Sequence, residues 1–173
     1  MRDALDLLWN GWRAAYVTSA GAAGGVAPED ESSVFTRILA SGLPDEESLI
    51  VHRGPTCFAI LNRFPYSTGH TLVLPYREVA ELEDLTEPEA GEIWQTVTDG
   101  VRALKAAYRP DALNVGINLG AAAGGSVARH LHVHIVPRWN GDANFMTATA
   151  YTRTMPEALP DTWAKVRSAW TSP

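Results

Sequence analysis

Hydrophobic positions recur with helical spacing at both ends of this 173-residue chain. Near the start they follow the pattern of an amphipathic helix, formed by Leu5, Leu8, Trp9, Trp12 and Tyr16. Residues 20–33 have no such periodicity and consist mostly of Ala, Gly, Pro, Ser and acidic residues, which predicts a flexible loop. At the other end, a helical extension is predicted over 157–170, with Leu159, Trp163, Val166 and Trp170 on one face.

Short apolar runs bounded by turn residues predict strands in the middle of the chain. Residues 49–53 and 56–61 are separated by a Gly-Pro pair, and residues 70–75 form a third run, so we expect an antiparallel meander. A long helix should then begin at Thr86, because Thr86 and Glu89 form a capping pattern with a proline between them. Its apolar face consists of Ile93, Val97, Val101, Leu104 and Tyr108.

The hydrophobic period changes to two after this helix. Between residues 113 and 119, Leu, Val and Ile alternate with Asn and Gly, which predicts a strand with one apolar and one polar face. A Gly-rich turn over 121–126 leads to another alternating strand over 130–137. Strands and helices in this order predict a single α+β domain with an antiparallel sheet.

Three of the five histidines stand at alternate positions of this last strand, namely His130, His132 and His134. Side chains at alternate strand positions share a face, so the three imidazoles should project together. This pattern leaves three interpretations open. It is a solvated histidine cluster, a zinc or iron site that lacks further ligands nearby, or a site where a neutral imidazole attacks phosphorus.

Groups that suit phosphate chemistry stand close to the histidines in sequence. The turn that contains Gly124, Gly125 and Ser126 would place backbone amides and a hydroxyl beside them, and such turns form anion-binding concavities. Asn118, on the polar face of the preceding strand, would add an amide donor. These neighbours favour the phosphorus interpretation.

Composition and charge narrow the class of protein. With 14 basic and 20 acidic residues the net charge is −6, which does not favour a nucleic-acid partner. The single cysteine, Cys57, cannot form an internal disulfide or a paired-cysteine zinc site. Acidic residues near Met1 are unlike an export signal, and no apolar run approaches the roughly 20 residues of a membrane helix. We therefore expect a cytoplasmic protein without a membrane partner.

Two blocks of the chain resemble the histidine triad (HIT) family. The first runs from Asn118 through the Gly-Gly-Ser turn to the alternating histidines and Pro137. The second contains Leu61-Asn62-Arg63-Phe64-Pro65 and the strand that starts at His70. The resemblance covers about residues 49–146 and implies a half-barrel of about five antiparallel strands with a long helix and terminal helices.

The resemblance also implies roles for individual residues. His132 would be the nucleophile that carries a nucleotidyl group, His134 would contact phosphate oxygens, and His130 would hold the network together with His70. The phosphate or leaving group would meet Ser126, Gly125 and Gly124, and Asn118 would donate to a phosphate oxygen. The nucleoside would bind Asn62 through its ribose and Leu61 and Phe64 beside the base. No metal or other cofactor is implied.

The branch within the family follows from segments outside these blocks. The tryptophan-bearing N-terminal segment and the Arg-Trp-Asn-Gly-Asp run after Pro137 resemble the bacterial branch that includes diadenosine tetraphosphate phosphorylases. The expected activity is nucleotidyl transfer or hydrolysis at the α-phosphate of a dinucleoside polyphosphate, with inorganic phosphate as acceptor. Alternatives are a nucleoside phosphoramidase, a GalT-like uridylyltransferase and a nucleotide-binding regulatory protein with low turnover. The resemblance further implies a homodimer, with a tetramer as an alternative.

Overall fold

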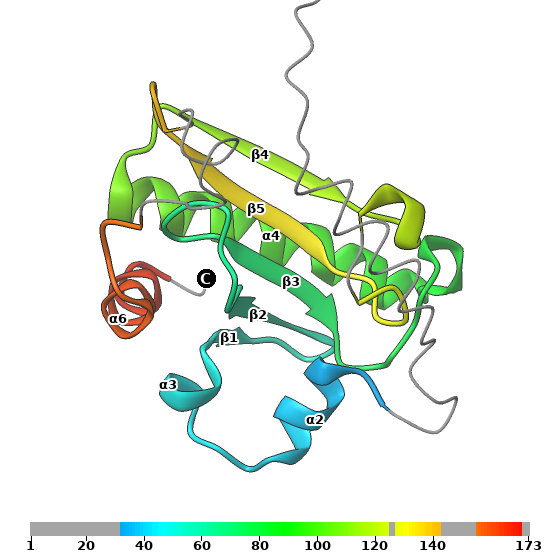
Figure 1. The fold of residues 1–173 in the computed structure, drawn as a ribbon. Coiled ribbons are helices and arrows are strands. Elements are labelled where there is room, and N and C mark those ends of the chain that lie inside the picture. Colours follow the sequence, from blue (N-terminus) through cyan, green and yellow to red (C-terminus); the bar gives the residue numbers. More distant parts are fainter. Residues whose placement is uncertain (1–31, 125–126, 143–154, 171–173) are drawn as a thin grey trace, which may run out of the picture. The chain divides into compact units, whose positions relative to one another are not determined.

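Five strands form one antiparallel sheet in the order β1-β2-β3-β5-β4 (Figure 1). The computed structural model describes residues 32–124, 127–142 and 155–170, which fall within one unit of the chain. The predicted helix at residues 5–16 and most of the predicted loop 20–33 lie outside this part. The strands are β1 (Ile50–Arg53), β2 (Cys57–Leu61), β3 (Thr71–Pro75), β4 (Ala112–Ile117) and β5 (Val133–Arg138). The helices are α2 (Val34–Ala40), α3 (Asp45–Ser48), α4 (Glu87–Tyr108) and α6 (Leu159–Ala169), with short 3-10 turns η1 (Leu82–Asp84) and η2 (Ala121–Ala123).

Helix α4 covers one face of the sheet and carries most of the core. It begins with the predicted capping box, because the Glu89 side chain accepts the Thr86 backbone N–H while Thr86 caps the Glu89 N–H. Against it pack the odd-numbered positions of β2 and β5, such as Ala59, Leu61 and Val133. Helix α6 packs beside α4, and its Trp163 donates from Nε1 to the Ile50 carbonyl at 2.8 Å. The predicted long helix and C-terminal helix are both present.

The opposite face of the sheet is covered near β1 and β2 by helix α2. Phe35 of α2 packs with Ile50, Phe58 and Ile60, so every residue of β2 is buried. The prediction of a flexible loop through residue 33 is therefore wrong at its end. Ser33 is buried and caps α2 by accepting the Thr36 backbone N–H on its hydroxyl.

Strand β4 forms one edge of the sheet. Its residues are exposed or half-buried, and Val115 is 42% exposed although it belongs to the predicted apolar face.

The tryptophans differ in burial, since Trp94 on α4 is half exposed, whereas Trp170 lies in the core. Among the described residues, no helix is long and apolar enough to cross a membrane.

Candidate active site

The histidine side chains gather on the face of the sheet that α4 does not cover. His134 lies in β5 opposite Leu72 of β3, and Leu72 belongs to the cluster around Phe35, whereas Val133 and Ile135 point into the α4 core. The ring of His70, just before β3, lies 5.2 Å from that of His134, and the ring of His132 lies 4.9 Å from it. Three of the predicted histidines therefore form one cluster.

Strand β5 starts later than the sequence predicted. It begins at Val133 rather than residue 130, so His130 and His132 precede the ladder instead of forming part of it. The reason lies in other partners for this segment. The Leu131 backbone N–H donates to the Val79 carbonyl at 2.7 Å, and His130 Nε2 lies 2.8 Å from the Pro75 carbonyl. The segment is thus held against the end of β3, and its histidines remain buried.

The ring of His70 contacts His134 directly. His70 Nε2 lies 2.9 Å from His134 Nδ1, and His70 Nδ1 accepts the Tyr66 backbone N–H at 3.0 Å. Because Nδ1 of His70 accepts, its Nε2 carries the proton and donates to His134 Nδ1. The remaining proton of neutral His134 then sits on Nε2. The loop before β3 thereby sets His134 as an N–H donor at Nε2.

His132 has the opposite assignment. Its Nδ1 lies 2.8 Å from the His130 carbonyl, which only accepts, so Nδ1 carries the proton. The unprotonated Nε2 is then free to act as a base or nucleophile. Burial lowers the pKa of His132, which keeps the ring neutral in this role. A neutral nucleophilic nitrogen and a donor nitrogen therefore stand on adjacent rings.

Burial also lowers the pKa of His134, to about 4, with a smaller contribution from the charge of neighbouring His132. The pKa of His130 is lowered by burial as well, against the raising effect of its bond to the Pro75 carbonyl. The site therefore holds neutral imidazoles at neutral pH. It would stabilise an anion through directed hydrogen bonds rather than through net positive charge.

Asn118 reaches this cluster from the end of β4. Its Nδ2 lies 3.3 Å from His134 Nε2, and β4 pairs Gly116 with His134, which confirms that the polar face of β4 points to the histidines. Since Nε2 of His134 carries a proton, a 180° turn of the amide presents Oδ1 to it and frees Nδ2 to donate elsewhere. Gly124 ends the η2 turn with a φ of 92°. Gly125 and Ser126 lie outside the described residues.

The residues predicted to hold the nucleoside do not share one face of the sheet, because side chains along β2 point alternately to its two faces. Leu61 points into the α4 core and is 2% exposed, so its predicted place beside the base is corrected. Ile60 occupies the histidine-side face instead. Asn62 accepts the Phe64 backbone N–H and has its Nδ2 3.3 Å from His70 Nδ1, while Phe64 is 80% exposed.

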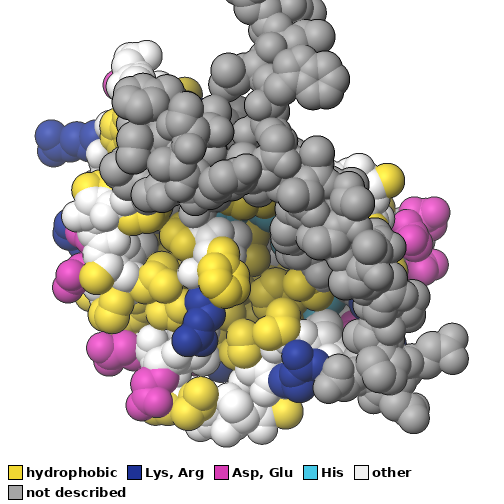
Figure 2. Space-filling view, viewed as in Figure 1, with side chains coloured by type: hydrophobic (Ala, Val, Ile, Leu, Met, Phe, Trp, Pro, Cys, Tyr) yellow, Lys and Arg dark blue, Asp and Glu magenta, His cyan; other side chains and the backbone are white. Residues whose placement is uncertain are grey.

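Several side chains at the site were not singled out from the sequence. The ring of Phe35 contacts those of His130 and His132 at 5.6 Å, and the ring of Tyr66 lies 4.4 Å from that of His70. The signal for α2 was present, since Ser33 precedes apolar residues at helical spacing. Figure 2 shows hydrophobic side chains gathered on this face, with histidine side chains at the border of the patch.

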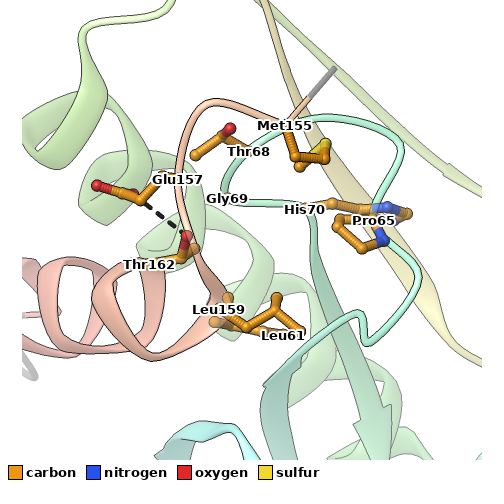
Figure 3. A pocket seen from close by; sticks show the side chains of 9 residues that line it. All are labelled: Leu61, Pro65, Thr68, Gly69, His70, Met155, Glu157, Leu159 and Thr162. Carbon is orange, nitrogen blue, oxygen red and sulfur yellow. Dashed lines mark hydrogen bonds between the residues drawn. The ribbon is translucent and has the colours of Figure 1, made fainter. Parts of the chain in front are cut away.

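A cavity of about 160 Å³ lies between the β2–β3 loop and the start of α6 (Figure 3). Its lining is mainly apolar apart from His70, Thr68, Thr162 and Glu157. Glu157 is engaged by hydrogen bonds from Thr162, Tyr108 and Lys165. At about 160 Å³ the cavity is smaller than the roughly 300–1,000 Å³ of typical ligand pockets. The histidine face therefore remains the candidate active site.

Over residues 32–124, 127–142 and 155–170, no three His, Cys, Asp or Glu side chains are arranged to hold a metal ion. Cys57 is buried, and burial raises the pKa of its thiol to about 11, so it is not a reactive thiolate at neutral pH.

An open antiparallel sheet backed by a long helix, with alternate histidines at one strand, defines the class of histidine triad proteins. The chain belongs to the HIT domain family, which matches residues 44–141. It is 44% identical over 174 aligned residues to AP-4-A phosphorylase of Mycobacterium tuberculosis H37Rv, covering 98% of this chain and 86% of that protein. The predicted family and bacterial branch are thus confirmed.

More distant relatives share part of the chain or the fold. Bis(5'-adenosyl)-triphosphatase of Saccharomyces cerevisiae S288c is 38% identical over 91 residues, covering 52% of this chain and 44% of that protein. A Hit-like protein of Bartonella henselae superposes with a TM-score of 0.64 at 26% identity, over 81% of this chain and 98% of that one. A zinc-bound histidine triad protein of Mycobacterium smegmatis superposes with a TM-score of 0.64 at 28% identity, over 80% of this chain and 93% of that one. The HIT fold is confirmed, and both named sequence relatives are enzymes.

Proposed function

We propose that this HIT-family enzyme cleaves dinucleoside polyphosphates and transfers the nucleotidyl group to inorganic phosphate. The nearly full-length similarity to AP-4-A phosphorylase supports the substrate class and the acceptor. The observation that carries the chemistry is the pair of adjacent neutral imidazoles. His132 has a free Nε2, and His134 has a protonated Nε2.

The first step is attack of His132 Nε2 on the α-phosphorus of the substrate. A P–N bond forms, the bond to the bridging oxygen breaks, and with diadenosine tetraphosphate the leaving group is ATP. His134 donates from Nε2 to a phosphoryl oxygen, and Asn118 donates from its amide. In this proposal Ser126 and the Gly125 amide contact the phosphate or leaving group, and Gly124 shapes the turn that presents them.

In the second step an oxygen of inorganic phosphate attacks the same phosphorus. The P–N bond breaks, His132 regains its free Nε2, and the product is ADP. The nucleoside would lie on the apolar face beside α2, with Asn62 at the ribose and Phe64 at the base. Ile60 replaces Leu61 in this arrangement, because Leu61 lies on the other face of β2.

The proposal includes the cellular compartment, domain organisation and oligomeric state of the protein. We place it in the cytoplasm as a single HIT domain with terminal additions, acting as a homodimer or tetramer. Its one cysteine is buried and free, which suits a reducing compartment. It needs no nucleic-acid partner and no cofactor.

Product analysis with and without phosphate tests this function. With diadenosine tetraphosphate and inorganic phosphate we expect equal amounts of ADP and ATP, and a large drop in rate when phosphate is removed. A panel that includes adenosine phosphoramidate distinguishes the alternatives. Phosphate-independent release of AMP from the phosphoramidate would identify a phosphoramidase, and AMP binding without turnover would identify a regulatory protein.

A further inference from the structure

Helix α2 begins directly against the histidine cluster, ahead of the matched HIT region at residues 44–141. Its N-cap residue, Ser33, has its hydroxyl oxygen 2.7 Å from His130 Nδ1 in a fully buried contact. The next turn brings in Thr36, whose hydroxyl donates to Glu78 at 2.8 Å. Ser33 therefore contacts His130, while Thr36 and Glu78, also outside the predicted site, contact Ser33.

The protons in this cluster can be assigned from the donors. Glu78 Oε2 accepts both the Ser33 backbone N–H at 2.8 Å and the Thr36 hydroxyl. The Thr36 hydroxyl proton is therefore used, and the Thr36 backbone N–H donates to the Ser33 oxygen at 3.1 Å. The Ser33 hydroxyl lies 3.1 Å from the Thr36 hydroxyl oxygen and 2.7 Å from His130 Nδ1, and the shorter contact directs its one proton to His130.

The assignment of His130 follows from its other nitrogen. Nε2 lies 2.8 Å from the Pro75 carbonyl, which can only accept, so Nε2 carries the proton and Nδ1 accepts from Ser33. Both ring nitrogens are thus saturated, and Phe35 packs edge-on against the ring at an interplanar angle of 88°. His130 cannot rotate without losing both hydrogen bonds.

The orientation of His130 matters because its backbone carbonyl receives the Nδ1 proton of His132 at 2.8 Å. That hydrogen bond decides which nitrogen of His132 is free. Phe35 contacts the His132 ring as well, with ring centroids 5.6 Å apart. The start of α2 therefore touches the nucleophile on one side and supports its hydrogen-bond acceptor on the other.

We propose that Ser33, held by Glu78 and Thr36, is a positioning residue that fixes the reactive tautomer of His132 through His130. Ser33 does not touch the substrate. It acts by holding the ring of His130 so that the adjoining carbonyl stays aimed at His132 Nδ1. The expected effect on catalysis rests on the proposed function. The effect on the tautomer of His132 can be measured without any substrate.

The test compares Ser33→Ala and Ser33→Gly with the wild-type protein. Glycine is a good N-cap and keeps α2 in place, so it removes the hydroxyl with little loss of helix stability. Nitrogen-15 NMR of the free protein should show His132 as a single Nδ1–H tautomer in the wild type and as a mixture in both variants. We expect kcat on diadenosine tetraphosphate to fall about tenfold or more with KM changed less than kcat, since misorientation affects the reacting atom.

Two further variants separate positioning from stability. Ser33→Thr retains the hydroxyl and should restore both the tautomer and kcat. Thr86→Ala removes the N-cap side chain of α4, away from the histidines, and should lower the melting temperature without changing the His132 spectrum or kcat.

The outcomes distinguish this proposal from the proposed function. A His132 spectrum unchanged in Ser33→Gly would overturn the positioning role, whatever the activity. A changed spectrum in a protein that does not cleave dinucleoside polyphosphates would retain the positioning role and overturn the proposed function. Equal loss of kcat in Ser33→Gly and Ser33→Thr would also contradict the positioning role, because only Ser33→Gly lacks the hydroxyl.

Discussion

At the scale of single residues, the site depends on imidazoles that remain neutral because they are buried. An ordinary imidazole with a pKa of 6.5 would be partly charged near neutrality, whereas the pKa of His134 is lowered to about 4. Protonation of Nε2 on His132 would remove the lone pair that the proposed reaction uses. Burial therefore keeps the Nε2 lone pair of His132, the proposed nucleophile, available.

This burial predicts how stability depends on pH. Between pH 6.5 and about 4 the unfolded His134 is protonated while the folded one is not. The unfolded state then binds more protons, so the free energy of unfolding should fall as the pH is lowered through this window. Urea unfolding across the range measures it, and His134→Gln should make the dependence shallower.

The carboxylates provide a control for that experiment. The Arg77 hydrogen bond lowers the pKa of Glu89 from 4.5 to about 2, so its contribution is present above pH 4.5 and is lost towards pH 2. Glu89→Gln should therefore change the pH dependence only below about 4.5. An unchanged slope between pH 6.5 and 4.5 in His134→Gln would contradict the assigned cause.

The reassignment of Leu61 predicts a separation between stability and binding. Leu61→Ala removes a core side chain and should cost about 2–5 kcal/mol of unfolding free energy, with the AMP affinity of the folded protein unchanged. Phe64→Ala, at an exposed position, should change stability by less than about 0.5 kcal/mol and weaken AMP. Urea unfolding and calorimetric titration measure both. Weakened AMP binding by a fully stable Leu61→Ala would restore Leu61 to the nucleoside site.

At the scale of elements, α4 packs closely at one glycine against β5 and the residue that ends α6. A Cβ on Gly100 would lie 2.8 Å from Ile135 Cδ1 and 3.0 Å from the Trp170 ring. Gly100→Ala should therefore destabilise the protein by about 1–3 kcal/mol, through overpacking, although alanine is the better helix former. Gly91 lies in the same helix with nothing near its Cβ position, so Gly91→Ala should stabilise by about 0.5–1 kcal/mol. Thermal unfolding measures both, and stabilisation by both would contradict the close packing.

The strands and helices that the sequence predicted best are those whose pattern is local. Strands β1 to β3 fall within one residue of the predicted runs, and α4 begins at the predicted cap. The start of β5 was wrong because His130 and Leu131 take long-range partners in Pro75 and Val79, which periodicity cannot reveal. Helix α2 was missed because it is short and adjoins a segment without periodicity.

The candidate site shows the same division. The three alternate histidines and Asn118 were identifiable because their residue types and spacing indicate chemistry, whereas His70 and Asn62 came from the resemblance to the HIT family. Ser33 and Glu78 were not, since they are 45 residues apart in sequence and meet only in the fold. Leu61 was misplaced because five consecutive buried residues in β2 give no sign of which face each one takes.

At the scale of the whole molecule, the β4 edge predicts how copies of the chain associate. Its place at the end of the strand order and the exposed Val115 suit pairing with a second copy, consistent with the expected homodimer. Val115→Lys should convert a dimer to a monomer in light scattering coupled to size exclusion. Leu43→Lys, between α2 and α3 and 48% exposed, should leave the dimer intact. A wild-type monomer, or a dimer that survives Val115→Lys, would contradict β4 pairing.

The net charge of −6 does not conflict with a polyanionic substrate. The site presents neutral hydrogen-bond donors, so it requires no positive surface around it. Acidic residues near the histidines are already engaged, as Glu78 is by the Ser33 N–H and the Thr36 hydroxyl. The local environment of the phosphate would therefore differ from the average charge of the surface.

The central claim is that His132 carries the nucleotidyl group between two substrates. Its most direct test is mass spectrometry of the protein quenched during reaction with diadenosine tetraphosphate in the absence of phosphate. We predict an adenylyl group on the peptide that contains His132, lost again on addition of phosphate with release of ADP, and absent from His132→Asn. An adduct on another residue, or activity of His132→Asn within about tenfold of wild type, would contradict the account.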